Sequence, residues 1–271
     1  MSESPRRQLV PRSRRLSCDV LHFHRQVPLC VQHRSVQLEK VNCLRRGTKT
    51  RVALPVVMLK ACSLAAAEIP ELRRAWLGGP VSSLYTHPES VAMLVIEREY
   101  LGERWLFWGR FRAPEETPLP ELQARLDQYL HGDVRSQFGR QLQLSSVPNP
   151  LRRALLWWNL NVSGRSRARR MGTFVLSTLA GRGTEIEFPP AFHTANFTYG
   201  PIGPDGRSRL TLAYDHRVFD GAVAAEALDR IEDVLHGRLS VEMEALVSPS
   251  RRDRSQERPT CASAQLLPVK S

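Results

Sequence analysis

The residues best suited to chemistry lie in one short segment, residues 215–221, with the sequence DHRVFDG. The segment follows an apolar run typical of a strand, residues 208–214, and precedes a pattern typical of an amphipathic helix, residues 222–235. A loop between a strand and a helix can direct an imidazole into a cleft. A neutral imidazole has an ordinary pKa of about 6.5, so it can remove a proton from a thiol or a hydroxyl at neutral pH. His216 is therefore a candidate general base.

Asp220 stands four residues after His216 and directly before Gly221. A carboxylate at this place can cap the following helix through backbone N–H groups, or it can pair with an arginine and fix the loop. Both roles are structural, and a histidine bonded to a backbone carbonyl would be structural too. The residue types alone therefore leave a catalytic and a purely structural interpretation of the segment open.

The remaining chain alternates between strand-like and helix-like patterns. Short or alternating apolar runs predict strands over residues 34–43, 91–97, 104–111, 173–179, 195–202 and 208–214. Apolar residues at helical spacing predict helices over residues 53–77 with a break at Pro70, 119–138, 151–160 and 222–235. A Gly-Pro-Asp-Gly turn at 203–206 predicts a hairpin, and Trp157 and Trp158 are expected to pack in the core. Regular βαβ alternation and a GxGxxG fingerprint are missing, so we predict an α/β fold with a mixed or largely antiparallel sheet.

The composition fits an ordinary globular protein of 271 residues, with 42% hydrophobic and 24% charged residues. No apolar run reaches the roughly 18 to 20 residues that cross a bilayer, and no apolar signal region follows the basic start. These features exclude an integral membrane protein and disfavour secretion.

Five cysteines without a CxxC pair fit buried reduced thiols, so we expect a cytoplasmic location. His22, His24 and His33 form no metal-ligand spacing, and no metal is expected.

The net charge of +12 is concentrated at the two ends of the chain. Residues 1–15 and 248–271 carry seven of the twelve charges, and we predict a basic flexible arm and a flexible tail there. Residues 16–247 are predicted as one domain, with the densest basic run in the Arg-rich segment 165–170. Only four of the 39 basic residues are lysines, which a coding bias toward arginine explains as simply as a ligand does. Nucleic acid is therefore not expected as a partner.

Three ordered motifs resemble one family of acyltransferases. Residues 215–221 resemble the DHRxxDG signature of the catalytic domain of dihydrolipoamide acyltransferases, the core subunits of 2-oxo acid dehydrogenase complexes. The wider HxxxDG pattern is shared with chloramphenicol acetyltransferase. Residues 172–179, GTFVLSTL, resemble the family's GTFTISNL strand, and residues 188–202, which begin FPPA, resemble its NPPQAAILGVG segment. Weaker similarity extends the match from about residue 14 to residue 239.

The resemblance implies a two-layer α/β sandwich like that of chloramphenicol acetyltransferase, assembled as a homotrimer with the active site between neighbouring subunits. His216 would be the general base for the thiol of coenzyme A or dihydrolipoamide as it attacks an acyl thioester. Ser177 would donate a hydrogen bond to the tetrahedral oxyanion. Asp220 would have a structural role in this catalytic set, paired with Arg14 or Arg15.

The sequence also departs from the family. A full dihydrolipoamide acyltransferase carries a lipoyl domain ahead of its catalytic domain, and the residues before Leu16 leave no room for one. We therefore expect no covalently bound lipoate in this chain and consider a lipoyl-bearing protein as a partner. Thr178 and Ala180 replace a family asparagine and glycine, and an Arg-rich insertion precedes Gly172. These changes leave the acyl group and the acceptor open.

We predict a free-standing acyltransferase that moves an acyl group between a coenzyme A or lipoyl thioester and a thiol or hydroxyl acceptor. A chloramphenicol-type O-acetyltransferase belongs to the same class. Two other classes stay open. One is a catalytically silent trimeric scaffold or partner-binding protein that keeps the fold. The other is a basic binder of nucleic acid or acidic surfaces that acts through the two ends of the chain.

Overall fold

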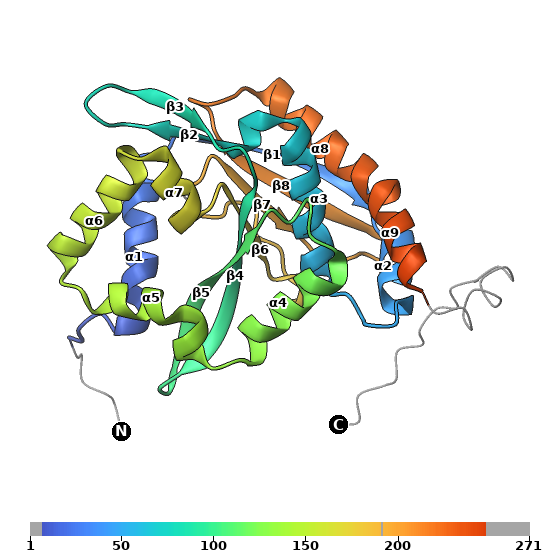
Figure 1. Cartoon of the computed structure of the whole chain (residues 1–271), viewed down its shortest axis with the longest axis horizontal. Coiled ribbons are helices and arrows are strands. Elements are labelled where there is room, and N and C mark those ends of the chain that lie inside the picture. Colours follow the sequence, from blue (N-terminus) through green and yellow to red (C-terminus); the bar gives the residue numbers. More distant parts are fainter. Residues whose placement is uncertain (1–6, 191, 248–271) are drawn as a thin grey trace, which may run out of the picture.

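The computed structural model describes residues 7–190 and 192–247, which fold around one six-stranded sheet (Figure 1). The helices in chain order are α1 Arg12–His24, α2 Glu39–Gly47, α3 Leu54–Glu68, α4 Leu119–His131, α5 Val134–Ser146, α6 Asn149–Asn161, α7 Gly164–Met171, α8 Gly221–His236 and α9 Arg238–Leu246. The strands are β1 Leu29–Gln37, β2 Arg74–Leu77, β3 Ser83–Thr86, β4 Val91–Tyr100, β5 Glu103–Arg112, β6 Phe174–Thr178, β7 Ala195–Tyr199 and β8 Arg207–Asp215. Short 3-10 turns lie at Pro70–Arg73 and Ala180–Arg182.

The large sheet has the strand order β1-β8-β7-β6-β4-β5. Neighbouring strands are antiparallel at β1/β8, β8/β7 and β4/β5, and parallel at β7/β6 and β6/β4. β2 and β3 form a separate antiparallel hairpin. The predicted α/β class with a mixed, largely antiparallel sheet is therefore confirmed.

One face of the sheet is covered by α3, α4 and α8, with α9 packed against α8 and α2, and the main hydrophobic core lies between these helices and the strands (Figure 1). α3 is buried on nearly every side because its residues from Val56 to Ala66 are apolar or small with few exceptions. α8 is amphipathic and buries Leu228 and Ile231. Burial of each such side chain stabilises the fold by about 1.5 to 3 kcal/mol. This layer holds the strands whose ends carry the predicted motifs.

The opposite face of β4, β5 and β6 carries Met93, Val95 and Val175. Helix α1 packs against β5 on this side and α7 against β4, whereas α5 packs along the edge strand β5, where its Phe138 stacks on Phe107 of the main core. α6 joins α1 through a small apolar cluster that includes Phe23 and Leu160 (Figure 1). The contacts of these helices with the sheet leave hollows between them, and the candidate site lies in one of these.

The folded domain begins earlier than the sequence predicts. Residues 1–15 are expected to form a flexible arm, but α1 starts at Arg12. The Nε of Arg12 donates to Ser145 Oγ at 2.9 Å, and Nη1 of Arg15 donates to the Ser145 carbonyl at 3.2 Å. Patterns of apolar residues cannot reveal this boundary because the contacts that fix it are polar. The predicted tail, residues 248–271, lies outside the described residues.

Two predicted elements are divided differently in the structure. The strand expected over residues 34–43 is the end of β1 followed by α2, because the spacing of Leu38 and Val41 suits a helix as well as a strand. The helix expected over residues 119–138 is two helices. The second begins at Asp133, whose carboxylate accepts a hydrogen bond from a backbone N–H in the first turn of α5.

The predicted burial of two tryptophans is wrong. Trp157 and Trp158 are 42% and 60% exposed, because α6 packs through its other side.

The thiols also differ from the expectation that all of them are buried. Cys62 is buried, but Cys18 and Cys43 are exposed.

Candidate active site

A cavity of about 520 Å³ lies between α1 and the outer face of β4, β5 and β6. Ser177 at the end of β6 and Trp108 of β5 line one wall, and Arg14 of α1 lines another. Phe192 and His193, which precede β7, complete it. Cavities of this size hold small-molecule ligands or parts of them. The structure therefore places the predicted hydroxyl donor, Ser177, on the wall of a cavity.

Strand alternation and one glycine direct Ser177 toward this cavity. Phe174 and Leu176 are fully buried in the main core, so Ser177 faces the other side of the sheet. The strand follows Gly172, which has a φ of +90°. A Cβ at this position would lie 2.3 Å from Met93 Cγ and 2.9 Å from a backbone carbonyl oxygen. Only glycine fits there, because a side chain would be both strained and overlapping.

Thr178 fixes the turn that follows Ser177. Its hydroxyl donates to the Tyr199 carbonyl oxygen at 3.0 Å and accepts from the Ala180 N–H at 3.0 Å. The side chain that replaces the family's asparagine thus makes hydrogen bonds to both neighbouring segments. This substitution leaves the position of Ser177 well defined.

His216 lies in the loop between β8 and α8, and the residues on either side of it hold the loop. The buried carboxylate of Asp215 accepts hydrogen bonds from Arg217 Nε at 2.9 Å and Arg217 Nη2 at 2.7 Å. The backbone N–H of His216 donates to the Pro28 carbonyl at 3.1 Å. A two-pronged arginine–carboxylate pair is geometrically specific. The backbone of His216 is therefore held from both sides, while its half-exposed ring lies beside the ring of Tyr214.

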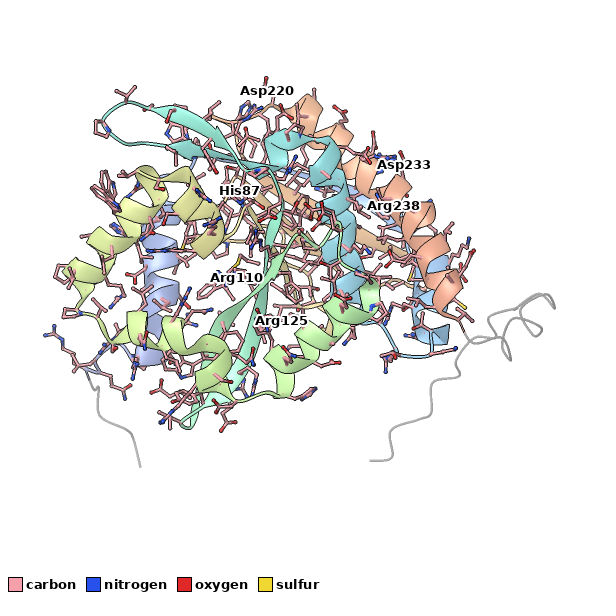
Figure 2. All side chains as sticks on the ribbon, viewed as in Figure 1. His87, Arg110, Arg125, Asp220, Asp233 and Arg238 are labelled. Atoms are coloured by element: carbon pink, nitrogen blue, oxygen red, sulfur yellow. The ribbon has the colours of Figure 1, made fainter. Side chains whose placement is uncertain are left out.

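The side chain of His216 is 47% exposed, and its Nδ1 lies 3.4 Å from Oδ1 of Asp220. Asp220 is itself 81% exposed and lies at the start of α8, at the periphery of the molecule (Figure 2). Asp220 occupies the N-cap position, but its side chain makes no capping hydrogen bond. The carboxylate thus faces the imidazole rather than the helix.

The predicted ion pair of Asp220 with Arg14 or Arg15 does not form within the described part of the chain. Arg14 lines the Ser177 cavity, and Arg15 donates to the Ser145 carbonyl. The structure therefore brings Arg14 to the same cavity as Ser177 and leaves Asp220 with His216.

The structure does not bring Ser177 and His216 together within one chain. Ser177 lines the cavity beside α1, whereas His216 and Asp220 are not among the described residues that line it. β7 lies between β6 and β8, and it runs parallel to β6 and antiparallel to β8, so the C-terminal ends of β6 and β8 lie at opposite ends of the sheet. Each side chain is thus presented at a different place on the surface of one chain.

His193 is a cavity residue that the sequence analysis does not select. It is 5% exposed, and its Nε2 lies 2.6 Å from the Met171 carbonyl oxygen. Burial lowers the pKa of His193 to about 4, so the ring is neutral at pH 7. Its Nδ1 has no partner among the described residues. The only sequence signal is its place between the FPPA stretch and β7, which does not reveal burial.

Arg167 supports the wall that carries His193. Its guanidinium is buried and donates to the carbonyl oxygens of Trp76, Leu160 and Phe192 at 2.6, 2.9 and 2.8 Å. Burial lowers the pKa of Arg167 to about 10, which still leaves it charged at neutral pH. At least one arginine of the segment 165–170 therefore serves to join α7, β2 and the cavity wall.

No group of three or more His, Cys, Asp or Glu side chains that could hold a metal ion occurs among residues 7–190 and 192–247. In the same part of the chain, every helix is too short or too polar to cross a bilayer.

No family model matches the sequence, and no curated protein matches it significantly. Solved structures match its fold over most of their length. A dihydrolipoamide acetyltransferase of Azotobacter vinelandii has a TM-score of 0.63 at 19% identity, with 87% of this chain and 94% of that chain covered. A probable dihydrolipoamide acetyltransferase of Listeria monocytogenes has a TM-score of 0.62 at 14% identity, with 90% and 97% covered. The cubic core of a pyruvate dehydrogenase multienzyme complex has a TM-score of 0.59 at 19% identity, with 87% and 94% covered.

These similarities define the class of fold. The chain has the fold of acyltransferase catalytic cores. More particularly, it resembles the catalytic cores of dihydrolipoamide acetyltransferases, as its three motifs predict. Identities of 14 to 19% concern the fold alone.

Proposed function

We propose that the protein is an acyltransferase that moves an acyl group between a coenzyme A or lipoyl thioester and a thiol or hydroxyl acceptor. The observation that carries the proposal is the outward presentation of His216, with Asp220 behind its Nδ1 and the Asp215–Arg217 pair holding the loop. The ring lies beside Tyr214 but makes no hydrogen bond to the backbone among the described residues, so Nε2 is free to take a proton.

The comparison with the Azotobacter enzyme supports these roles. Its structural and enzymatic description concerns a serine, a histidine and an asparagine in the catalytic mechanism, and the last two lie four positions apart. His216 and Asp220 have the same spacing. In this chain a carboxylate stands where that enzyme has an amide, and it can stabilise a protonated imidazole.

We further propose a homotrimer in which the cavity of one subunit receives the His216 loop of its neighbour. The separation of Ser177 from His216 in one chain supports this arrangement, because a shared site would join the two residues. The similarity to the core of a multienzyme complex also supports an assembly of several subunits. In a cyclic trimer every subunit would contribute one cavity and one His216 loop.

The reaction would follow from the orientation of the imidazole. A proton on Nδ1, directed at Asp220, leaves the lone pair of Nε2 available. His216 takes the proton of the attacking thiol or hydroxyl, the resulting nucleophile adds to the thioester carbonyl, and Ser177 donates a hydrogen bond to the oxyanion. When the carbon–sulfur bond of the thioester breaks, the leaving thiolate takes the proton back from His216. Charges and protons balance over the two steps.

The separation of Ser177 from His216 in one chain also supports a competing function, an inactive scaffold with the same fold. If the subunits assembled in a way that kept the two residues apart, the protein would have no complete active site. Exchange of an acetyl group between acetyl-coenzyme A and a free thiol, measured for the wild type and His216→Ala, separates the two functions. A rate above background that His216→Ala abolishes supports the enzyme. Equal background rates in both proteins support the scaffold.

A further inference from the structure

Five arginines surround a second hollow of about 520 Å³ on the same side of the sheet as the Ser177 cavity. Its lining consists of arginines and serines only: Arg110, Arg140, Arg165, Arg169, Arg170, Ser163 and Ser166. We call the five arginines the arginine cluster. They come from β5, α5 and α7, which are separate in the sequence. The fold therefore adds Arg110 and Arg140 to the three arginines that the run 165–170 contributes.

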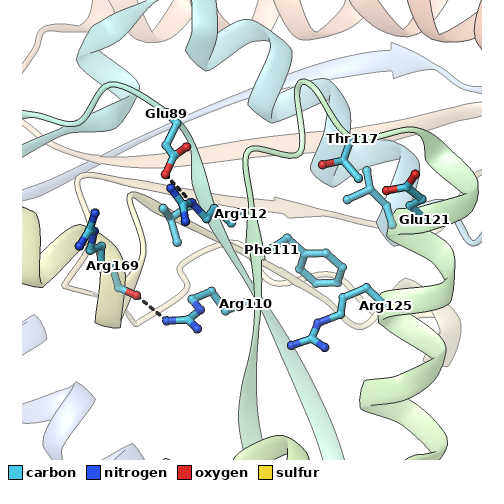
Figure 3. Close-up of a pocket in the computed structure, with 10 residues that line it drawn as sticks. Glu89, Arg110, Phe111, Arg112, Thr117, Glu121, Arg125 and Arg169 are labelled. Atoms are coloured by element: carbon cyan, nitrogen blue, oxygen red, sulfur yellow. Dashed lines mark hydrogen bonds and ion pairs between the residues drawn. The ribbon is translucent and has the colours of Figure 1, made fainter.

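The guanidinium groups of the arginine cluster have no carboxylate partner among the described residues. Arg110 Nη1 donates to the Arg169 carbonyl oxygen at 2.7 Å, and Arg170 Nη1 donates to Asn159 Oδ1 at 3.1 Å. By contrast, the neighbouring Arg112 pairs with Glu89 at 2.6 Å (Figure 3). Like charges held around one hollow repel each other, and a bound anion offsets this electrostatic repulsion. The arrangement is suited to a ligand with several negative charges.

The hollows on this face adjoin one another, because neighbouring hollows share residues in their walls. Trp108 lines both the Ser177 cavity and a groove of about 920 Å³. Arg110 and Arg170 line both that groove and the arginine hollow. The register of the sheet gives the distance between the arginine hollow and Ser177. Val175 of β6 and Arg110 of β5 both pair with Met93 of β4, so Arg110 lies two strands across from β6.

Ser177 lies two residues beyond Val175 along β6, which places the Arg110 backbone roughly 12 Å from that of Ser177. An elongated ligand can therefore reach Ser177 with one end and the arginines with the other. Guanidinium groups bind phosphate and carboxylate through paired N–H donors, and five of them around one hollow suit a ligand that carries several negative charges there, such as a group of phosphates.

We propose that the arginine cluster binds the phosphates of an elongated thioester substrate, with the nucleotide end of coenzyme A on the arginines and the thiol end directed to Ser177. This inference rests on the proposed acyl-transfer function for the choice of substrate. The charge and composition of the hollow support a ligand with several negative charges, and the proposed function supplies the phosphates. Arg165 and Arg169 are the members best suited to testing, because their side chains make no hydrogen bond within the described part of the chain.

The test is calorimetric binding of coenzyme A, dephospho-coenzyme A and pantetheine to the wild type and to R165Q/R169Q. We expect the wild type to bind coenzyme A at least about tenfold more tightly than pantetheine, since charge-assisted hydrogen bonds from guanidinium groups to the phosphates are available to coenzyme A alone. The double variant should lose most of this preference and keep its affinity for pantetheine. R46Q/R238Q, which changes two exposed arginines on α2 and α9, is the matched control and should behave like the wild type.

Three outcomes would overturn the assignment. They are an unchanged affinity for coenzyme A in R165Q/R169Q, an equal loss of pantetheine and coenzyme A affinity, and a loss of duplex DNA binding with coenzyme A unaffected. R140Q provides a second variant, with a smaller expected loss, if the double variant unfolds. Failure of the proposed function is distinguishable: if acetyl exchange is absent while coenzyme A binding still depends on the cluster, the phosphate site stands and the acyltransferase does not.

Discussion

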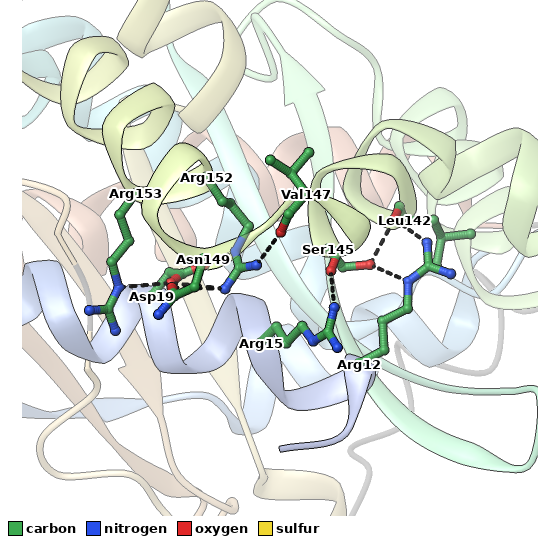
Figure 4. Close-up of polar contacts among 9 residues, drawn as sticks. All are labelled: Arg12, Arg15, Asp19, Leu142, Ser145, Val147, Asn149, Arg152 and Arg153. Atoms are coloured by element: carbon green, nitrogen blue, oxygen red, sulfur yellow. Dashed lines mark hydrogen bonds and ion pairs between the residues drawn. The ribbon is translucent and has the colours of Figure 1, made fainter. Parts of the chain in front are cut away.

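Asp19 of α1 and Arg152 of α6 form an ion pair whose side chains are only 2% and 3% exposed (Figure 4). Arg153 Nε lies 3.3 Å from the same carboxylate, and Arg152 Nη1 donates to the Val147 carbonyl oxygen at 2.7 Å. The pair fastens α6 to α1, the helix that carries Arg14 into the cavity. Charged groups thus determine the position of one wall of the candidate site.

Asp19→Ala should lower the free energy of unfolding by about 3 to 5 kcal/mol, because the Arg152 guanidinium would remain buried without its carboxylate. Urea unfolding measures this change. Glu226→Ala, on the exposed side of α8, is the control and should change stability by no more than about 0.5 kcal/mol. A loss below about 1 kcal/mol for Asp19→Ala would mean that the pair does not secure α1.

Gly172→Ala should lower the free energy of unfolding by at least about 2 kcal/mol, since the new Cβ is strained at positive φ and overlaps Met93. Gly181→Ala is the matched control, because a Cβ at Gly181 meets no atom within 4 Å. Thermal unfolding of the two variants compares them directly. Equal melting temperatures would contradict the stated requirement for glycine before β6.

The burial of His193 predicts a pH dependence of stability. Between its ordinary pKa of 6.5 and its folded value of about 4, the unfolded chain binds more protons at this residue than the folded chain. The stabilisation is therefore complete above pH 6.5 and is lost as the pH falls toward 4, by on the order of 3 kcal/mol. Burial also lowers the pKa of His87, which titrates in the same direction.

His193→Gln removes this titration and keeps a donor for the Met171 carbonyl, so its unfolding free energy should fall less steeply in that pH range. Urea unfolding of the wild type and the variant at several pH values measures the difference between their free energies of unfolding. The contribution of His87 is the same in both proteins and cancels. If the free energies of unfolding of the two proteins fell equally steeply with pH, His193 would not titrate as its burial implies.

Ser177→Ala should lower kcat of acyl transfer by about a hundredfold to a thousandfold with little change in KM, because the proposed hydrogen bond is strongest in the transition state. Ser17→Ala is a suitable control, since Ser17 lines the same cavity from α1. Steady-state rates of acetyl exchange measure both variants. If the two substitutions have the same effect on kcat, Ser177 is not the oxyanion donor.

The loop of His216 could be predicted because its position depends on local order in the sequence. An apolar strand, a polar turn and an amphipathic helix follow one another, and the structure places β8, the His216 loop and α8 there. The strand of Ser177 could be predicted for the same reason. The cavity could not, because α1 and β6 form it from distant parts of the chain and no local pattern records their contact.

Buried charge is the second feature that the sequence does not reveal. Asp19, Arg152 and Arg167 are residue types that are ordinarily exposed, and each is buried here by partners remote in sequence. The same limit applies to the arginine cluster. The run 165–170 is visible in the sequence, but its contribution with Arg110 and Arg140 to one hollow depends on tertiary structure.

The central claim is a site that joins Ser177 of one subunit to His216 of the next, and co-expression of His216→Ala with Ser177→Ala chains tests it most directly. Each variant alone should show background acetyl exchange. The randomly assembled population of trimers should regain roughly a quarter of the wild-type rate, because an intact serine meets an intact histidine at about one interface in four when all trimers are counted. A mixture that stays at background, beside an active wild type and with mixed assembly verified by affinity tags, would contradict the shared site.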